Sequence, residues 1–545
     1  MIPSARPTQP QGGRDDSTGR EKAMRRRTLL AATAAVLAAP AVRAESGKVL
    51  RFIPQSDITA LDPVWTTATV SRNHGFLVFD TLYGTDENYA ASPQMVAGHV
   101  VENDGLRWRL TLRDGLRFHD GEPVRARDCV ASVRRWAARD FFGLALIQAT
   151  DELSAPDDRT IVFRLNKRFS LLPDALAKPA SSMCPIMPER LASTDPFRQV
   201  TDMVGSGPYR FLPDERITGA RVVYAKNAAY VPAPGRASFT AGGKVPILDR
   251  VEWNVIPDPA TAAAALLAGE ADWWEQPTVD QLPMLQKGGI VVQVDDPASN
   301  IGCLRFNHLY PPFDNPAIRR AVLGVIDQAD CMSAAAGTDR TYWKDRTGVF
   351  GSASPMASEA GIEVLTSPRD PARVKRELAA AGYNGERVVT LIGSDMAITA
   401  AMGEVAADEL HQAGMNIDLQ MTDWGTVIQR RASRAPIDKG GWNIFFTFLE
   451  GTNIFNPAGH LGIRGNGEQA WFGWPTAPKL EALRQAWFDA PDLAAQQAIC
   501  HELQLQFWQD VPYVPLGEYF RPGARRRNIT VPTKGFPLFF NVTKS

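Results

Sequence analysis

The sequence predicts an α/β fold built from several sheets and more than one lobe. Segments of alternating polar and apolar residues, typical of strands, recur along the chain between alanine-rich segments whose apolar residues repeat at helical spacing. No segment repeats at a fixed period. The chain has 545 residues. Single hydrophobic cores stop growing near roughly 250–300 residues, so we expect at least two lobes.

The first half of the chain contains most of the predicted strands. Residues 106–112 and 116–118 are predicted to be two strands joined by a turn at Asp114-Gly115, a strong turn dipeptide. Residues 126–139 place apolar side chains at helical spacing, with arginines on the opposite side. Further strands are expected at residues 48–53, 160–165, 209–211 and 251–256, and a further helix at residues 260–268.

A second block begins near Ile301. Asn315 is a favoured helix cap and Pro316 a favoured first helical residue, so a helix is expected to start there. Gly414 is expected to end another helix. The remaining predicted elements are helices at residues 400–413, 478–488 and 492–508, and strands at residues 303–306, 417–421 and 511–516.

A signal peptide is predicted over residues 1–44, with Met24 as the expected start. Three arginines at residues 25–27 precede the short apolar run 31–39, and the small residue Ala44 comes last before the predicted cut. The apolar run is shorter than the roughly 20 residues that span a bilayer. The arginines resemble a twin-arginine export signal, although they also fit the general export route. We therefore expect a periplasmic protein.

The charge balance argues against a nucleic-acid partner. The chain has 59 basic and 60 acidic residues. A nucleic-acid-binding surface needs clustered basic residues that displace counterions from phosphates. The arginine runs at residues 25–27 and 525–527 are too short and isolated to form one.

No motif predicts catalysis, a cofactor or a metal. The seven histidines are dispersed without an H-E-x-x-H pattern, and no P-loop or G-x-S-x-G elbow is present. The five cysteines occur singly, without a C-x-x-C pair, and sequence alone assigns no disulfide among them. We expect no enzyme activity, and only His74 and His460 would be tested as metal ligands.

Several segments, in order along the chain, resemble family 5 of the bacterial extracellular solute-binding proteins, which includes dipeptide-, oligopeptide- and nickel-binding proteins of ABC importers. The most specific segment is residues 108–128, close to the family signature. It also has a structural explanation without a ligand, since it places turns around a short strand whose neighbours face a core. The supporting segments are residues 78–83, 205–209, 256–258, 267–272, 306–307, 311–315, 319–321 and 326–327.

The resemblance implies a class II periplasmic-binding-protein fold of two lobes, with mixed sheets and a hinge of two crossing strands. The large lobe is expected at residues 45–300, with a subdomain at about 85–201. The small lobe is expected at residues 301–510, and residues 511–545 are expected to return to the large lobe. Such hinges let the lobes close on a ligand.

The resemblance also places candidate ligand contacts in the small lobe. In peptide-binding members an aspartate pairs with the ligand's α-amino group, but the matching position here is Asn453, which cannot neutralise an ammonium. Glu450 substitutes for it if the loop shifts by a turn. Dipeptide-type members use an arginine in a loop that here carries Asp395, which favours a cationic or hydroxylated ligand. Peptide binding is therefore in doubt.

Aromatic side chains are further candidates. Trp471 and Trp474 lie in a glycine-rich loop whose family counterpart edges the cleft, where they either stack on a ligand or pack beneath the loop. Candidates from cleft-lining segments of the large lobe are Trp65, Thr66, Thr67 and Tyr519.

The predicted function is capture of a small solute, peptide-like or another polar organic molecule, and its delivery to the permease and ATPase of an ABC importer. The expected partners are the solute and this membrane complex, with the chain acting as a monomer. A periplasmic ligand sensor or chaperone on the same fold stays open as an alternative. A twin-arginine-exported enzyme is disfavoured because no cofactor motif is present.

Overall fold

The computed structural model describes residues 48–545, so the predicted signal peptide at residues 1–44 and the expected start at Met24 lie outside the described residues. β1 runs parallel to both of its neighbours in a seven-stranded mixed sheet, in the order β12-β19-β11-β1-β10-β9-β8. Alternation along β1 buries Leu50 and Phe52 and leaves Arg51 exposed. The strands are β1 (Val49–Ile53), β8 (Tyr209–Phe211), β9 (Arg221–Lys226), β10 (Arg250–Asn254), β11 (Trp273–Trp274), β12 (Val291–Gln293) and β19 (Gly523–Arg525).

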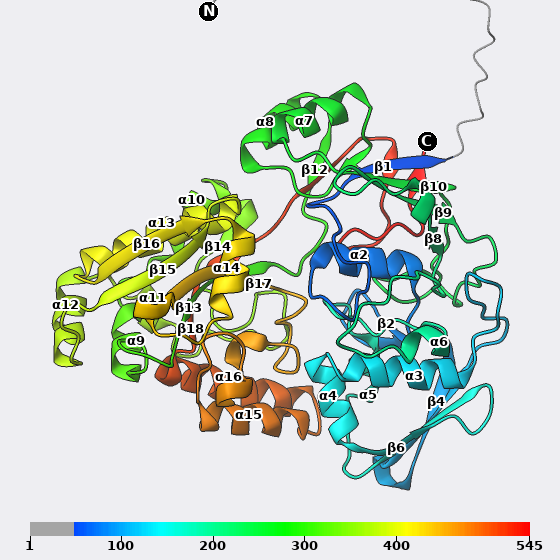
Figure 1. Ribbon diagram of the computed structural model, residues 1–545, viewed down its shortest axis with the longest axis horizontal. Helices are drawn as coiled ribbons and strands as arrows, with labels where there is room; N and C mark the ends of the chain where they lie inside the picture. Colours follow the sequence, from blue (N-terminus) through cyan, green and yellow to red (C-terminus); the bar gives the residue numbers. More distant parts are fainter. Residues whose placement is uncertain (1–47) are drawn as a thin grey trace, which may run out of the picture. The chain divides into compact units, whose positions relative to one another are not determined.

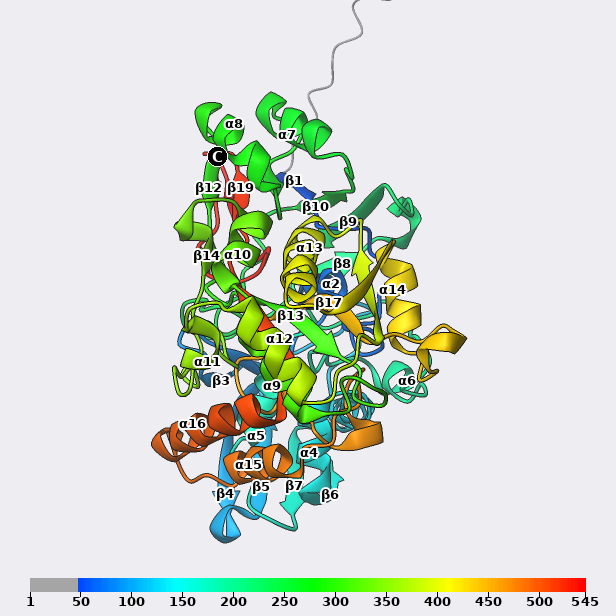
Figure 2. The same ribbon diagram turned by 90° about the vertical axis from the view of Figure 1, so that its left-hand side faces the viewer.

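A second mixed sheet has six strands in the order β14-β18-β13-β17-β15-β16. β15 runs parallel to β16 and β17, whereas β13 is antiparallel to β17 and β18. Helices α10 (Gln328–Ala336) and α13 (Ala397–Gln412) pack on this sheet (Figures 1 and 2). The strands are β13 (Asn300–Phe306), β14 (Trp343–Lys344), β15 (Arg387–Gly393), β16 (Asn416–Thr422), β17 (Ile444–Glu450) and β18 (Tyr513–Tyr519).

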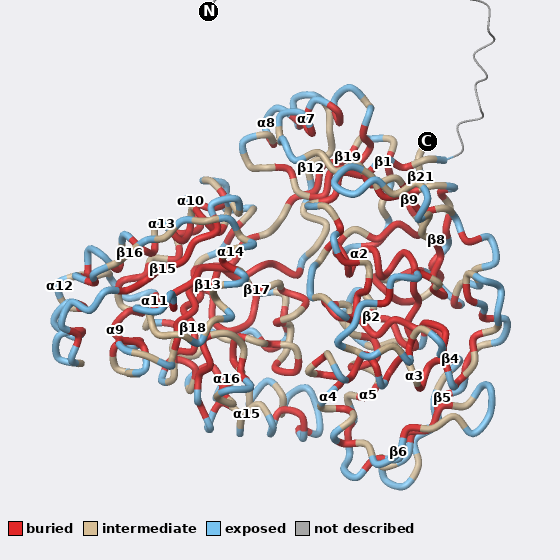
Figure 3. The backbone as a smooth tube through the Cα atoms, viewed as in Figure 1, coloured by how far each residue is buried: buried red, intermediate tan, exposed pale blue. Residues whose placement is uncertain are grey.

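β13 and β18 are buried along their whole length (Figure 3). A strand that is covered on both faces cannot alternate polar and apolar residues, so its polar side chains need partners inside the protein. Arg305 of β13 is an example: it is fully buried and donates to the carbonyls of Phe472, Gly462 and Pro512 at 2.7, 2.8 and 3.0 Å. This one side chain ties the central strand to the loop of Trp471.

A four-stranded antiparallel sheet, in the order β4-β5-β7-β6, contains the start of the signature segment in β5. Trp108, Leu110 and Phe118 are buried, as the sequence predicted. Gly115 and Gly121 have positive φ values of 78° and 91°, which confirms both turns. The strands are β4 (Val96–Glu102), β5 (Arg107–Leu112), β6 (Thr150–Ser154) and β7 (Thr160–Leu165), and the small sheets pair β2 (Tyr83–Thr85) with β3 (Ala91–Pro93) and β20 (Ile529–Thr530) with β21 (Thr543–Lys544).

The predicted strand at residues 116–118 is wrong. Only one isolated bridge, from Arg117 to Pro123, forms in this segment. The N–H groups of Phe118 and Val124 form this bridge, and the N–H of Ala126, which would extend it, donates to the carbonyl of Asp158 instead. The segment is therefore a pair of consecutive turns.

Two other segments of the family resemblance pack directly against each other. Gly207 donates its N–H to the carbonyl of Val78 at 2.9 Å, and the N–H of Asp80 donates to the Ser206 hydroxyl at 3.1 Å. A Cβ atom at Gly205 would clash with the carbonyl of Val78. The glycines are thus explained by a close approach of two backbones, which supports their prediction as a turn.

Helix starts follow the cap residues that the sequence suggested. Asn315 accepts from the N–H of Ala317 at 2.9 Å, and Pro316 is the first residue of α9. The helices are α2 (Thr69–Val78), α3 (Ala126–Ala137), α4 (Phe141–Gln148), α5 (Leu172–Ala177), α6 (Glu189–Ala192), α7 (Pro259–Ala268), α8 (Leu282–Lys287), α9 (Pro316–Leu323), α10 (Gln328–Ala336), α11 (Glu363–Thr366), α12 (Pro371–Ala380), α13 (Ala397–Gln412), α14 (Trp424–Arg431), α15 (Pro478–Phe488) and α16 (Leu493–Asp510).

The C-terminal segment pairs with strands of both large sheets, one after the other. β18 still belongs to the six-stranded sheet, and the chain joins the seven-stranded sheet only at β19. The lobe boundaries at residues 300, 510 and 511 stay predictions.

All five cysteines are buried and free: Cys129, Cys184, Cys303, Cys331 and Cys500. Burial raises the pKa of each thiol above its ordinary value. Among residues 48–545, no helix is both long and apolar enough to cross a membrane.

Candidate functional site

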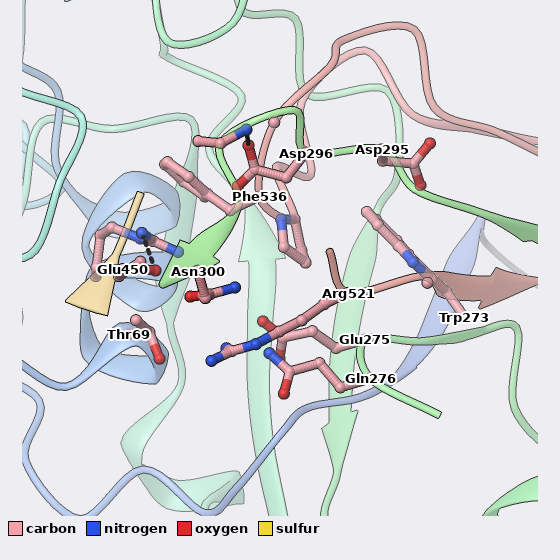
Figure 4. A pocket seen from close by; sticks show the side chains of 15 residues that line it. Thr69, Trp273, Glu275, Gln276, Asp295, Asp296, Asn300, Glu450, Arg521 and Phe536 are labelled. Atoms are coloured by element: carbon pink, nitrogen blue, oxygen red, sulfur yellow. Dashed lines mark hydrogen bonds and ion pairs between the residues drawn. The ribbon is translucent and has the colours of Figure 1, made fainter. Parts of the chain in front are cut away.

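A cavity lies where the seven-stranded and six-stranded sheets meet (Figure 4). Its volume is about 60 Å³, below the roughly 300–1,000 Å³ typical of pockets that enclose a whole small ligand. It therefore admits a polar group of a ligand or a few waters in this arrangement. Its lining comes from segments far apart in the sequence: Thr69, Arg72, Trp273, Glu275, Gln276, Asp295, Asp296, Ala298, Asn300, Glu450, Arg521, Gly523, Gly535, Phe536 and Pro537.

Arg72 of α2 and Glu450 of β17 form an ion pair across the cavity. Arg72 Nη1 lies 2.8 Å from Glu450 Oε1, and the two side chains are only 3% and 13% exposed. The guanidinium also lies 3.7 Å from the centre of the Phe536 ring. The second carboxylate oxygen of Glu450 accepts from Asn453 Nδ2 at 2.9 Å. Both oxygens of Glu450 are therefore already bonded within the protein.

Asp295 is neutralised in the same way. Its Oδ2 lies 2.5 Å from Nη1 of Arg525, a residue of β19. Burial raises the pKa of Asp295, while Arg525 opposes that rise. This ion pair joins the loop after β12 to β19, the strand that pairs with β12.

Two other carboxylates of the cavity have no cation in contact. Asp296 accepts only the N–H of Ala298, at 2.9 Å, and burial raises its pKa to about 7. Glu275 is 7% exposed and accepts from the N–H of Gln55 and from Asn73 Nδ2, at 2.8 and 2.9 Å. Burial raises the pKa of Glu275 as well. Within the described chain neither carboxylate has an ion-pair partner.

Arg521 is the counterpart on the basic side. Its guanidinium donates to the Tyr519 hydroxyl at 3.3 Å and lies 4.4 Å from the centre of the Phe448 ring. Burial opposes its charge, but the neighbouring Tyr519, Glu450 and Glu275 outweigh that effect and raise its pKa. In Figure 4 its side chain extends between Asn300 and Glu275.

Asn300 opens β13 at the cavity and is 5% exposed. Its Oδ1 is buried and has no hydrogen-bond partner within residues 48–545. An unsatisfied buried amide oxygen is costly, and such groups call for an explanation. A donor from a bound solute would satisfy it.

The structure brings three of the sequence-predicted residues to this site. Glu450 lines the cavity, Asn453 bonds to Glu450, and the buried Tyr519 bonds to the lining residue Arg521. Trp65, Thr66 and Thr67 lie just before α2 and do not line the cavity. The carbonyl of Trp65 accepts from Arg139, and the hydroxyl of Thr66 accepts from the N–H of Ala68. Their contact with a solute stays a prediction.

Trp471 and Trp474 lie in an aromatic cluster separate from the cavity. Trp474 is 6% exposed, with its ring centre 6.1 Å from that of Trp442. Trp471 makes an edge contact with Phe445 at 5.5 Å, and Arg431 lies against both Trp471 and Phe445. These contacts match the alternative in which the rings pack beneath their loop; stacking on a solute stays a prediction.

Asp395 is exposed and does not line the cavity. Its Oδ1 accepts from the N–H of Trp424, at the start of α14, at 2.7 Å. We expect Asp395→Ala to lower the free energy of unfolding by about 1 kcal/mol, because one side-chain hydrogen bond is lost. Urea unfolding measures this change, and unchanged solute affinity in the same variant would argue against a role for Asp395 in binding.

Sequence reasoning missed Arg72, Glu275, Asp296, Asn300 and Arg521. Paired carboxylates such as Asp295-Asp296 are commonly solvated turn residues, so the pair by itself does not indicate a site. A signal was nevertheless present for Asn300, because it stands at the head of a strand that is otherwise almost wholly apolar. For Arg521 and Glu275 the sequence shows no comparable signal.

The two histidines considered as metal ligands are packed in cores. His74 is fully buried and contacts the Tyr224 hydroxyl at 2.9 Å. His460 is 1% exposed, and its ring nitrogens contact the carbonyl of Val349 and the N–H of Gly462. In the part of the chain that the structure describes, no group of three or more His, Cys, Asp or Glu side chains is arranged to hold a metal ion.

Comparisons with known proteins agree with this architecture. Two solved structures share the fold with a TM-score of 0.74. One is a periplasmic binding protein of A. tumefaciens in complex with agropinic acid, 19% identical, covering 91% of this chain and 99% of the other. The second is a dipeptide-binding protein of Pseudoalteromonas sp. in complex with Met-Leu, 20% identical, covering 91% and 100%. These likenesses confirm the predicted periplasmic-binding-protein fold with mixed sheets.

Sequence relatives span nearly the whole chain. A probable peptide ABC transporter periplasmic-binding protein of Sinorhizobium fredii is 36% identical over 525 residues, 95% of this chain and 98% of the relative. A glutathione-binding protein of Pectobacterium atrosepticum is 25% identical over 533 residues, covering 93% and 95%. The family model described as the middle part of bacterial extracellular solute-binding proteins, family 5, matches residues 90–462. The chain therefore belongs to family 5 of the bacterial extracellular solute-binding proteins.

Proposed function

We propose that the chain is the periplasmic solute-binding component of an ABC importer. It captures a small polar solute at the cavity around Asn300 and delivers it unchanged to a permease and ATPase complex, acting as a monomer. Membership of the family supports solute binding, and the name of the 36% identical relative supports the importer and the periplasm. Export through the twin-arginine route is part of this proposal and rests on the arginines before the apolar run.

The observation that carries the proposal is the convergence of charged groups from distant segments. Arg72 comes from α2, Glu275 from the segment after β11, Glu450 from β17 and Arg521 from the link between β18 and β19. A cavity with a few convergent polar groups is typical of a ligand site. These charged side chains come from segments at both major sheets. A solute bound among them would therefore stabilise one arrangement of the two sheets over others.

The predicted lobes fit this role. We infer that residues 45–300 and the end of the chain form one lobe and residues 301–510 the other, with β13 and β18 leading between them. Closure of two such lobes hides a solute from water and presents one shape to the importer. The small cavity volume is what a closed, solute-free arrangement would leave.

The proposal is tested by purifying the mature chain without unfolding it and releasing any bound solute for mass spectrometry. Thermal-shift measurements with peptides, sugars and metal chelates follow. We expect one solute per chain and a raised melting temperature. Turnover of the solute would contradict the proposal, and so would a complete lack of bound solute and of thermal shifts. Failure of the bound form to stimulate transport in reconstituted vesicles would favour the sensor alternative.

A further inference from the structure

We infer that Asp296, assisted by Asn300 and Glu275, binds a protonated nitrogen of the solute. The inference rests on the proposed function and adds the chemical class of the solute, an amine or guanidinium compound. It also moves the predicted partner of that group from the loop of Asn453 to the loop between β12 and β13.

The balance of charges around the cavity supports a cationic group. Four carboxylates line it: Glu275, Asp295, Asp296 and Glu450. Arg525 neutralises Asp295 and Arg72 neutralises Glu450. Of the lining cations only Arg521 is left to face Asp296 and Glu275, so the described residues offer three guanidinium groups to four carboxyl groups. Glu275 is buried and Asp296 is partly buried. A carboxylate withdrawn from water without a cation is unfavourable, and a solute cation would relieve that cost.

The geometry singles out Asp296 rather than Glu450. One oxygen of Glu450 is bonded to Arg72 and the other to Asn453. Binding an ammonium there would require breaking a buried ion pair. Asp296 accepts a single backbone hydrogen bond through Oδ1, and none of the described residues donates a hydrogen bond to its Oδ2. A carboxylate accepts up to about four bonds, so Asp296 has free capacity.

Asn300 provides an independent indication of a missing donor. Its Oδ1 is buried without a partner, and the residue lines the same cavity as Asp296. Figure 4 shows both side chains on the cavity wall, with Arg521 extending between Asn300 and Glu275. An ammonium carries three donors and a guanidinium five, and neither accepts a hydrogen bond. Such a group would donate to the amide oxygen and to Asp296, and Glu275 would add electrostatic attraction to it.

The size of the cavity fits a charged end group. A site of about 60 Å³ holds several water-sized positions, enough for an ammonium or guanidinium, because one water needs roughly 10–15 Å³ of such space. An anionic solute held by Arg521 is the competing possibility. It would leave Asp296 and Glu275 uncompensated and add to the negative charge.

The test uses isothermal titration of the full mature chain with pairs of compounds that differ by one amine. The pairs are L-alanyl-L-alanine with its N-acetyl derivative, L-lysine with its diacetyl derivative, and putrescine with butanediol. We expect only amine forms to bind. Asp296→Asn is expected to weaken their binding by about 30-fold or more, the effect of losing one partner of a desolvated charge pair. Asp296→Glu should retain part of the affinity.

Asp158→Asn is the control, because Asp158 also loses one charge but is exposed and far from the cavity lining. It is expected to bind like the unmodified chain, and unchanged melting temperatures show that each variant folds. If none of these compounds binds, the solute released from the purified chain and identified by mass spectrometry tests the inference. A protonated nitrogen in that solute supports the inference, and its absence overturns it.

Equal binding of acetylated and free amines, or an Asp296→Asn variant of full affinity, overturns the inference while solute binding itself stands. If only compounds that carry a carboxylate and no amine bind, Arg521 and not Asp296 holds the solute. If no compound binds and no solute leaves with the purified chain, the proposed function fails, and this inference fails with it.

Discussion

Lys244→Met is expected to lower the free energy of unfolding by about 3–5 kcal/mol, the usual cost of removing one partner of a buried ion pair. Lys244 Nζ lies 2.8 Å from Asp80 Oδ1, and both side chains are 1% exposed. Without the ammonium, the Asp80 carboxylate would remain buried with neutral donors only. Chemical unfolding followed by fluorescence measures the loss.

Neutral groups around Asp80 cannot replace the cation. The Tyr230 hydroxyl and Gln94 Nε2 donate to Oδ2 at 2.7 and 3.2 Å, and the N–H of Thr81 donates to Oδ1 at 3.0 Å. Burial works against the charged form, yet the attraction of Lys244 and these bonds together hold the pKa of Asp80 below its ordinary value. The carboxylate therefore stays ionised and needs its partner.

Two variants separate this explanation from a simple loss of packing. Adding Asp80→Asn to Lys244→Met should recover part of the lost stability, because no unpaired charge is then buried. Lys226→Met removes an exposed lysine and should change the free energy by less than about 0.5 kcal/mol. A Lys244 variant no less stable than the Lys226 control would contradict the prediction.

Acid is expected to destabilise the protein through His74 and His460, by an amount on the order of 5 kcal/mol for each ring. Burial lowers the pKa of both rings from 6.5 to about 3. Between these pH values the unfolded chain binds more protons than the folded chain does. Stability contributed by the two neutral rings is therefore complete above pH 6.5 and is lost as the pH falls toward 3.

His460→Gln isolates one of these contributions. The amide of glutamine can still donate to the carbonyl of Val349 and accept from the N–H of Gly462, two of the contacts that the ring makes; the third is with the Tyr513 hydroxyl at 3.2 Å. We expect the variant to be less stable than the unmodified chain at pH 8 and to show a shallower loss of stability below pH 6.5. Urea unfolding across this pH range measures both slopes.

His411→Gln serves as the comparison, because it makes the same substitution at an exposed histidine near the end of α13. Carboxyl groups with raised pKa, such as Glu409 at about 8, favour the folded state as the pH falls and oppose the histidines. They are common to all variants, so their effect cancels in the difference. Identical slopes for the His460 and His411 variants would refute the assignment.

Much of the fold could be predicted because local signals agreed with the packing. The cap at Asn315, the turns at Gly115 and Gly121 and the alternation of β1 each satisfy a backbone or solvation requirement that depends on neighbours in sequence. Residues 116–118 failed because apolar content alone does not supply a pairing partner.

The site was harder, because its chemistry depends on which charges remain unpaired. Glu450 could be found from its place in a family motif, but its pairing with Arg72 joins residues 378 positions apart. Asp295 and Asp296 look alike in sequence, yet one meets Arg525 and the other meets no cation. Such differences arise from long-range contacts, which residue type and spacing do not reveal.

The five buried thiols link the route of export to the chemistry of folding. Thiolates, not thiols, react with oxidants, and burial with a raised pKa makes the native cysteines inert. A chain that crosses the membrane already folded keeps every sulfur shielded from the oxidising compartment. A chain that folds after crossing exposes five reactive sulfurs while no native disulfide exists to guide their pairing, so each disulfide formed then is a folding error.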